Sequence, residues 1–281
     1  MKTPLEVLKL YPSHDYTLAG AFASRLQAGP QREFLVHQNR RWSWQSFSDA
    51  SIKLARALTA RGIKKSDRVG IVARNSDAHV LLLFACARLG AIMVPSNPEF
   101  GVQEIGYVLK HAGVSAVICG AENLAVVREA TAGVAPAPWF ALVDGAEKDA
   151  PDFFSLIEQG GASDLPSAGG ADDTCLIIYT SGTTGFPKGA MHSQRNFITA
   201  GEANISRVWL QPDDRMMVVL PMFHVNALFY SLAGAVAAGA TLVLMQRFSA
   251  SDFWNACVEH GITQVNIIEA VGRILARRPR S

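Results

Sequence analysis

Short apolar runs alternate with helix-like segments from residue 45 onward, and this alternation constrains the fold more than any other feature. The spacing of Phe47, Leu54 and Leu58 marks one face of a helix, and Gly62 follows as a stop signal. The elements expected next are a strand at 69–73, a helix at 77–89 between Ser76 and Gly90, a strand at 92–94, a helix at 102–112 and a strand at 115–119. Repeated β-α-β units predict an α/β fold with layered, mainly parallel β-sheets flanked by helices.

A small, polar segment rich in Pro and Gly interrupts this pattern at residues 160–173. Such a composition is typical of a loop between folded units. We predict that it links a first α/β subdomain, residues 1–165, to a second, residues 174–281, which opens with the apolar run 174–179.

The composition is that of a globular protein. The 281 residues are 49% apolar and 18% charged, and a chain of this length can bury a large core. The net charge of +2 does not favour a nucleic-acid partner, and the basic cluster at 277–280 is interpreted as a solvated helix end. The cysteines stand singly and form no Cys-x-x-Cys pair, which favours free thiols in a cytoplasmic protein over a zinc site or a disulfide framework.

The stretch 216–246 contains no Asp, Glu, Lys or Arg and is long enough to span a membrane. Pro221, His224, Gly234 and Gly239 interrupt it, however. Buried parallel strands give similar uncharged runs. We therefore favour a strand at 216–220, a helix at 226–238 and a strand at 241–244, and we expect no integral membrane span.

A loop rich in glycine and hydroxyl groups follows the apolar run 175–178, and residues 179–189 read Tyr-Thr-Ser-Gly-Thr-Thr-Gly-Phe-Pro-Lys-Gly. Glycines let backbone N–H groups approach an anion, and Lys188 adds a compact positive charge. This pattern is typical of a polyphosphate-binding loop. It is not a Walker A loop, because Gly189 and not a hydroxyl residue follows the lysine. The alternative is a surface turn that binds nothing, which the Pro-Lys-Gly order disfavours.

This stretch resembles the signature phosphate loop of the AMP-forming, acyl-adenylate-forming enzymes, which include acyl-CoA synthetases, aryl-CoA ligases, luciferases and peptide-synthetase adenylation domains. Segments at 62–69, 75–76, 89–91 and 94–98 also resemble the family, in the same order. The resemblance implies the N-terminal domain of the adenylate-forming fold, with ATP, Mg²⁺ and CoA as cofactors. It implies that the β- and γ-phosphates are bound by Thr180, Ser181, Gly182, Thr183, Thr184, Gly185 and Lys188, and that the Thr180 hydroxyl lies nearest the metal.

A second family-like motif is Leu-Pro-Met-Phe-His at 220–224, where a strand end closed by proline brings an aromatic ring and an imidazole together. The resemblance implies that Phe223, His224 and Asn226 contact the carboxylate substrate, that residues 263–268 line the pocket floor, and that His224 joins Lys188 as a candidate catalytic residue. The alternatives are a core histidine for His224 and a helix cap for Asn226. The segment 239–254 resembles ligases of small or medium carboxylates, including carnitine-type ligases.

The family's adenine and ribose motifs, its magnesium-binding glutamate and its lid domain with the catalytic lysine are not found in this sequence. We therefore expect the fold to be incomplete without a C-terminal half and the 281-residue chain to be inactive alone. The resemblance implies that the chain is the N-terminal part of a carboxylate–CoA ligase. Its partners would be a carboxylate, ATP and CoA, and a homodimer is one option for its assembly. The alternatives are an adenylation domain that loads a carrier protein and a non-catalytic nucleotide-binding or scaffold protein, which a stop codon directly after Ser281 would favour.

Overall fold

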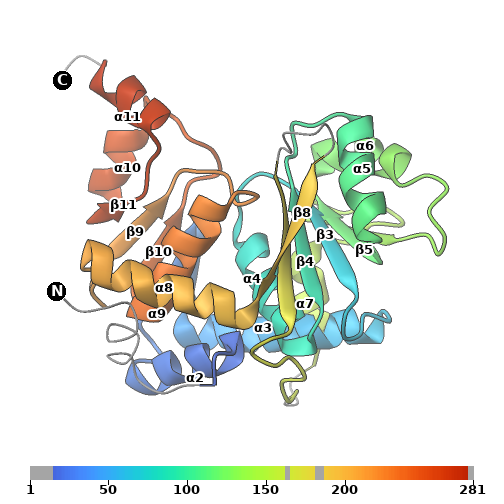
Figure 1. Ribbon diagram of the computed structural model, residues 1–281, viewed down its shortest axis with the longest axis horizontal. Coiled ribbons are helices and arrows are strands. Elements are labelled where there is room, and N and C mark those ends of the chain that lie inside the picture. The colour runs from blue at the N-terminus through green and yellow to red at the C-terminus, as the bar shows by residue number, and fades with distance from the viewer. Residues whose placement is uncertain (1–14, 162–164, 181–186, 278–281) are drawn as a thin grey trace.

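The computed structural model describes residues 15–161, 165–180 and 187–277 and shows two β-sheets flanked by helices (Figure 1). The predicted α/β class with layered, mainly parallel sheets is confirmed. The two sheets lie side by side, with helix α4 between them (Figure 1).

The six-stranded sheet has the order β6-β5-β3-β4-β7-β8. Its strands are β3 (Arg68–Val72), β4 (Ile92–Ser96), β5 (Ala116–Cys119), β6 (Trp139–Leu142), β7 (Thr174–Thr180) and β8 (Lys188–Ser193). All neighbours pair in parallel except β7 and β8, which form an antiparallel hairpin at the edge of the sheet.

The five-stranded sheet has the order β11-β9-β10-β1-β2. Its strands are β1 (Glu33–His37), β2 (Arg40–Ser43), β9 (Arg215–Val218), β10 (Thr241–Leu244) and β11 (Gln264–Val265). Strand β1 pairs in parallel with β10, and β2 returns antiparallel to β1. Each sheet therefore contains strands from both sides of residues 160–173, and the division into two subdomains stays a prediction.

The helices follow the sequence pattern closely where local end signals are strong. They are α2 (Leu18–Ala28), α3 (Trp44–Ala60), α4 (Asp77–Leu89), α5 (Val102–Ala112), α6 (Leu124–Ala130), α7 (Phe153–Gln159), α8 (Gln194–Val208), α9 (Ala233–Ala238), α10 (Phe253–Glu259) and α11 (Glu269–Ala276), with a 3₁₀ turn at Ala121–Asn123. The predicted bounds of α4 and α5 are confirmed, because Gly90 and Gly113 end these helices in the left-handed region, with φ of 69° and 64°.

Helix α4 forms much of the core, since it is buried on nearly every side. A helix that is apolar all round belongs inside a protein. Its first residue, Asp77, is a buried carboxylate with partners from β2. The Arg40 guanidinium donates two hydrogen bonds of 2.7 Å to Asp77, and the Trp42 indole donates one of 2.9 Å. These bonds offset the cost of burying the charge and tie β2 to the start of α4.

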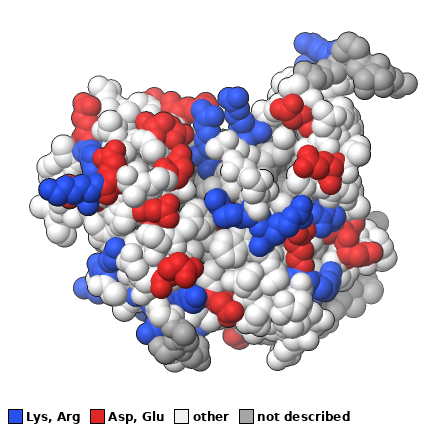
Figure 2. Space-filling view, turned by 180° about the vertical axis from the view of Figure 1, so that it is seen from behind, with Lys and Arg blue, Asp and Glu red and all other residues white. Residues whose placement is uncertain are grey.

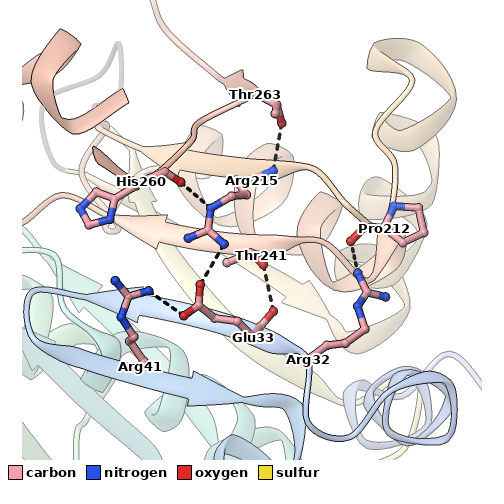
Figure 3. A network of polar contacts seen from close by, with 8 residues as sticks. All are labelled: Arg32, Glu33, Arg41, Pro212, Arg215, Thr241, His260 and Thr263. Atoms are coloured by element: carbon pink, nitrogen blue, oxygen red, sulfur yellow. Dashed lines mark hydrogen bonds and ion pairs between the residues drawn. The ribbon is translucent and has the colours of Figure 1, made fainter. Parts of the chain in front are cut away.

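A polar network on the five-stranded sheet holds β1 in place (Figure 3). Glu33 on β1 forms ion pairs with Arg41 on β2, at 2.8 Å, and with Arg215 on β9, at 2.9 Å. The Thr241 hydroxyl on β10 donates to the Glu33 carbonyl oxygen at 2.9 Å. Because β10 lies between β1 and β9, the Glu33–Arg215 pair spans one strand and adds a side-chain link to the backbone ladders.

The uncharged stretch 216–246 folds as predicted for a globular core. Strand β9 is followed by a π-helical segment at Asn226–Leu232, by α9 and by β10. In the part of the chain that the structure describes, no helix is long and apolar enough to cross a membrane. Acidic and basic side chains are interspersed on the face seen in Figure 2, in keeping with the small net charge.

Candidate functional site

The β7–β8 hairpin carries the glycine-rich loop predicted to bind phosphate. Thr180, the last residue of β7, is paired with Lys188, the first residue of β8, and both side chains are exposed. The loop residues Ser181, Gly182, Thr183, Thr184 and Gly185 lie outside the described residues, so their assignment to phosphate binding stays a prediction. The described hairpin therefore brings together the two ends of the loop.

Gly189 allows the two strands of this hairpin to approach closely. A Cβ atom at Gly189 would lie 2.9 Å from Ile177 Cγ2 and 3.2 Å from the Tyr179 ring, both on the facing strand. Contacts this short force neighbouring groups to move. The glycine after Lys188 thus has a packing role in the base of the loop.

Aromatic side chains from α5 pack against the base of the loop. The Tyr107 hydroxyl donates to the Pro187 carbonyl oxygen at 3.0 Å, and His111 Nδ1 lies 2.7 Å from the Tyr179 hydroxyl oxygen. Burial, followed by the proximity of Tyr107, raises the pKa of Tyr179 to about 12. Sequence analysis did not identify Tyr107 or His111, although two aromatic rings four residues apart on one helix face were a usable signal.

A cavity of about 510 Å³ opens beside this hairpin. Its wall is made by residues from the ends of β4 and β7, from α5 and from the segment after β9. The lining residues are Pro95, Ser96, Asn97, Phe100, Val108, Ile178, Tyr179, Thr180, Pro187, Phe223, His224 and Val225. The two predicted motifs, the phosphate loop through Thr180 and the Leu-Pro-Met-Phe-His segment through Phe223 and His224, therefore meet at one cavity.

Phe223 and His224 lie side by side in the wall, with ring centroids 4.4 Å apart. A turn holds this segment, in which the His224 backbone N–H donates to the Pro221 carbonyl oxygen at 3.0 Å. Partial burial lowers the pKa of His224 from its usual value. At neutral pH the imidazole is therefore mostly uncharged and offers one donor and one acceptor nitrogen.

Three other predicted site residues or segments do not line this cavity. Asn226 begins the π-helical segment without capping it, and its Oδ1 atom is buried with no hydrogen-bond partner among the described residues. Lys188 is not in the cavity wall, although its neighbour Pro187 is. From the run 263–268, Ile268 lines a second cavity, of about 280 Å³.

The second cavity adjoins the first, because Asn97 and Phe223 line both. Phe223 is therefore a shared wall between them. Asn75, Pro221 and Phe248 also line the second cavity.

Ser96 is a further feature of the first cavity that sequence analysis missed. The residue is 4% exposed, and its Oγ atom has no hydrogen-bond partner within the described ranges. A buried hydroxyl without a partner is unfavourable, and a polar ligand in the cavity can satisfy it.

Comparisons with known proteins agree with the fold and the motifs. A family model described as AMP-binding enzyme matches residues 22–280. The long-chain-fatty-acid–CoA ligase FadD13 of Mycobacterium tuberculosis is 32% identical over 242 residues, which cover 85% of this chain and 46% of the relative. The crotonobetaine/carnitine–CoA ligase of Salmonella paratyphi A is 30% identical over 245 residues, which cover 85% of this chain and 47% of the relative.

Among solved structures, the inhibitor-bound N-terminal domain of FACL13 from Mycobacterium tuberculosis superposes with a TM-score of 0.80 at 28% identity. The match covers 92% of this chain and 64% of that one. The chain spans about half the length of the curated relatives it matches. The resemblance found in the sequence is confirmed: the chain belongs to the AMP-binding enzyme family and matches the N-terminal portion of its fold.

Proposed function

We propose that the chain is the N-terminal part of an ATP-dependent, AMP-forming carboxylate–CoA ligase. Such an enzyme joins a carboxylic acid and ATP into an acyl-adenylate with release of pyrophosphate, and CoA thiol then displaces AMP. The observation that carries this proposal is the meeting of Thr180 with Phe223 and His224 at one cavity. Because the chain spans about half the length of its relatives, the complete reaction is proposed for an enzyme of the relatives' full length.

The proposed phosphate contacts come from both ends of the hairpin loop. Residues directly opposite in an antiparallel pair project to the same side of the sheet, so the Thr180 hydroxyl and the Lys188 ammonium share one face. Lys188 would neutralise phosphate charge. The Thr180 hydroxyl would donate a hydrogen bond to a phosphate oxygen or coordinate Mg²⁺ through its oxygen. Developing negative charge on a transferred phosphoryl group is stabilised by such fixed positive groups.

The Mg²⁺ ion would be held largely by ATP, with the Thr180 hydroxyl as its proposed protein ligand. The described residues contain no group of three or more His, Cys, Asp or Glu side chains that could enclose a metal. Mg²⁺ in nucleotide sites keeps several waters and takes few protein ligands besides the phosphates, so a single hydroxyl such as that of Thr180 suits it. When bound, the ion would neutralise phosphate charge.

The carboxylate would lie against Phe223 and His224. Because burial lowers the pKa of His224, the neutral ring can donate one hydrogen bond to a carboxylate oxygen at neutral pH. Phe223 would supply an apolar surface for the acyl group, and most of the cavity wall is apolar. In this arrangement the carboxylate would face Thr180, at the start of the proposed phosphate loop.

The relatives support CoA as the acyl acceptor, because both are named CoA ligases. They do not agree on the acid, since one name gives long-chain fatty acids and the other crotonobetaine and carnitine. We therefore propose a CoA acceptor over a carrier protein and leave the acid as an apolar or small carboxylate.

Calorimetric titration of the purified chain with magnesium tripolyphosphate tests the proposal, because this probe needs only the phosphate loop and no adenine site. We expect binding that MgATP competes for and that equimolar sulfate at matched ionic strength does not reproduce. Absence of binding would leave the loop as a surface turn and overturn the proposal. A parallel assay should detect no acyl-CoA from the chain alone, and thioester formation would show that the chain needs no lid lysine.

A further inference from the structure

Asn75 connects the ends of three strands from both sheets through one buried side chain. It follows β3, precedes α4 and is 5% exposed. Its Nδ2 atom donates to the carbonyl oxygens of Leu220, at 2.9 Å, and of Met245, at 3.2 Å. Its Oδ1 atom accepts from the Met222 backbone N–H at 2.8 Å.

These three backbone groups lie just beyond β9 and β10, outside the described strand ladders. Leu220 and Met222 flank Pro221, which has no N–H and prevents the segment from pairing as a strand. Buried backbone groups that leave a ladder need other partners. The Asn75 carboxamide supplies them from the neighbouring sheet.

The carboxamide suits this role because it offers two donors and an acceptor in one plane. An aspartate would place a charge against two carbonyl oxygens, and an alanine would leave three buried groups without a partner. Loss of such partners costs more than the hydrogen bonds themselves are worth. The chemistry of the position therefore requires an amide.

The segment that Asn75 holds leads directly into the cavity wall. Met222 precedes Phe223, and the Pro221 carbonyl oxygen accepts from the His224 backbone N–H at 3.0 Å. Asn75 itself lines the second cavity, which shares Phe223 with the first. We propose that Asn75 is a positioning residue for carboxylate recognition, which holds Phe223 and His224 in the wall between the two cavities; the inference rests on the proposed function.

The test compares Asn75→Ala and Asn75→Ser with Gln194→Ala. Gln194 is a matched control, because its buried carboxamide accepts from the Leu18 N–H at 2.8 Å and donates to the Ala87 carbonyl oxygen at 3.1 Å, away from both cavities. Asn75→Ser keeps one donor and one acceptor, so it supplies the measurement if the alanine variant does not fold. Histidine-labelled protein is followed by NMR, with His224 resonances assigned from His224→Gln.

The Asn75 variants should shift the His224 ring resonances and weaken hexanoate binding about tenfold, while magnesium tripolyphosphate binding stays within about twofold. Gln194→Ala should leave the His224 resonances and hexanoate binding unchanged, even if its melting temperature falls as much as that of the Asn75 variants. Unchanged His224 resonances in the Asn75 variants, or an equal change in Gln194→Ala, would overturn the inference. If neither hexanoate nor 4-hydroxycinnamate shifts the His224 ring resonances of the wild type, the proposed carboxylate pocket is wrong. The His224 resonances of the ligand-free variants then still show whether Asn75 holds His224 in position.

Discussion

Thr180 lies directly opposite Lys188 in the antiparallel pairing of β7 and β8. Opposite residues in such a pair have Cβ atoms about 4.5–5.5 Å apart and side chains on one face. The hydroxyl and the ammonium at the two ends of the glycine-rich loop therefore point to the same side. A phosphate held between them would contact both strands of the hairpin at once.

Lys188→Ala should weaken nucleotide handling with little effect on folding. We expect magnesium tripolyphosphate to bind about tenfold more weakly and kcat/KM for adenylation by the complete enzyme to fall about 10–1,000-fold, or about 1.4–4 kcal/mol. The melting temperature without ligand should barely move, because an exposed side chain rarely changes stability by more than about 0.5 kcal/mol. Lys64→Ala, at another exposed lysine, is the control. Equal binding by both variants would mean that Lys188 does not contact phosphate.

His224→Ala and Phe223→Ala should change the preference among carboxylates more than the KM for ATP, because both side chains line the cavity proposed for the acid. The measurement is kcat/KM for an aliphatic and an aromatic acid in the complete enzyme. A His224→Ala variant with unaltered acid preference and lowered thermal stability would support the alternative that His224 is a core histidine.

The fold should lose stability in acid partly through His79. This ring is fully buried in α4, and burial, followed by the nearby His37, lowers its pKa to about 3. The unfolded state binds a proton first, at its ordinary pKa near 6.5, so stability falls as the pH drops from about 6.5 toward 3. The loss from this group is about 2 kcal/mol at pH 5.

Urea unfolding at pH 7, 6 and 5 measures this effect. His79→Gln cannot take up the proton, so its free energy of unfolding should fall less steeply with acid than that of the wild type, whatever its value at pH 7. Gln194→Ala, which removes a buried side chain that does not titrate, should keep the wild-type slope. Parallel curves for His79→Gln and the wild type would contradict the prediction.

Ser96→Ala should raise the stability of the ligand-free protein by about 0.5–1 kcal/mol, since it removes a buried hydroxyl that has no partner within the described residues. Thr241→Val is the matched control, because the Thr241 hydroxyl donates to the Glu33 carbonyl oxygen and its loss should cost about 1 kcal/mol. Chemical denaturation of both variants checks the opposite signs. A destabilised Ser96→Ala would show that the hydroxyl is satisfied in the free protein.

The elements that were predicted well are those whose ends are specified by residues close in the sequence. Gly90 and Gly113 end α4 and α5 through their own backbone conformation, which the sequence reveals directly. Strands β1 and β2 were not predicted, because β1 is specified by pairing with β10 far along the chain. The π-helical geometry at Asn226–Leu232 was also missed, since its residues read as an ordinary helix.

In the candidate site, too, features with a local sequence signal were predicted and features set by long-range contacts were not. The phosphate loop and the segment containing Phe223 and His224 were recognised as motifs, because each is contiguous in the sequence. Ser96 and Tyr107 were missed, since their relation to the site exists only once β4 and α5 lie beside the hairpin. The three hydrogen bonds of Asn75 join segments about 150 residues apart and have no local signal.

The parallel pairing of β1 with β10 has a consequence for synthesis on the ribosome. His37 and Leu244, which face each other in that pairing, are separated by 207 positions. At about 5–20 residues per second, the β1–β2 hairpin emerges roughly 10–40 s before its partner strand exists. During that interval its apolar edge has no native neighbour and is open to pairing with another chain, and slower elongation lengthens this exposure.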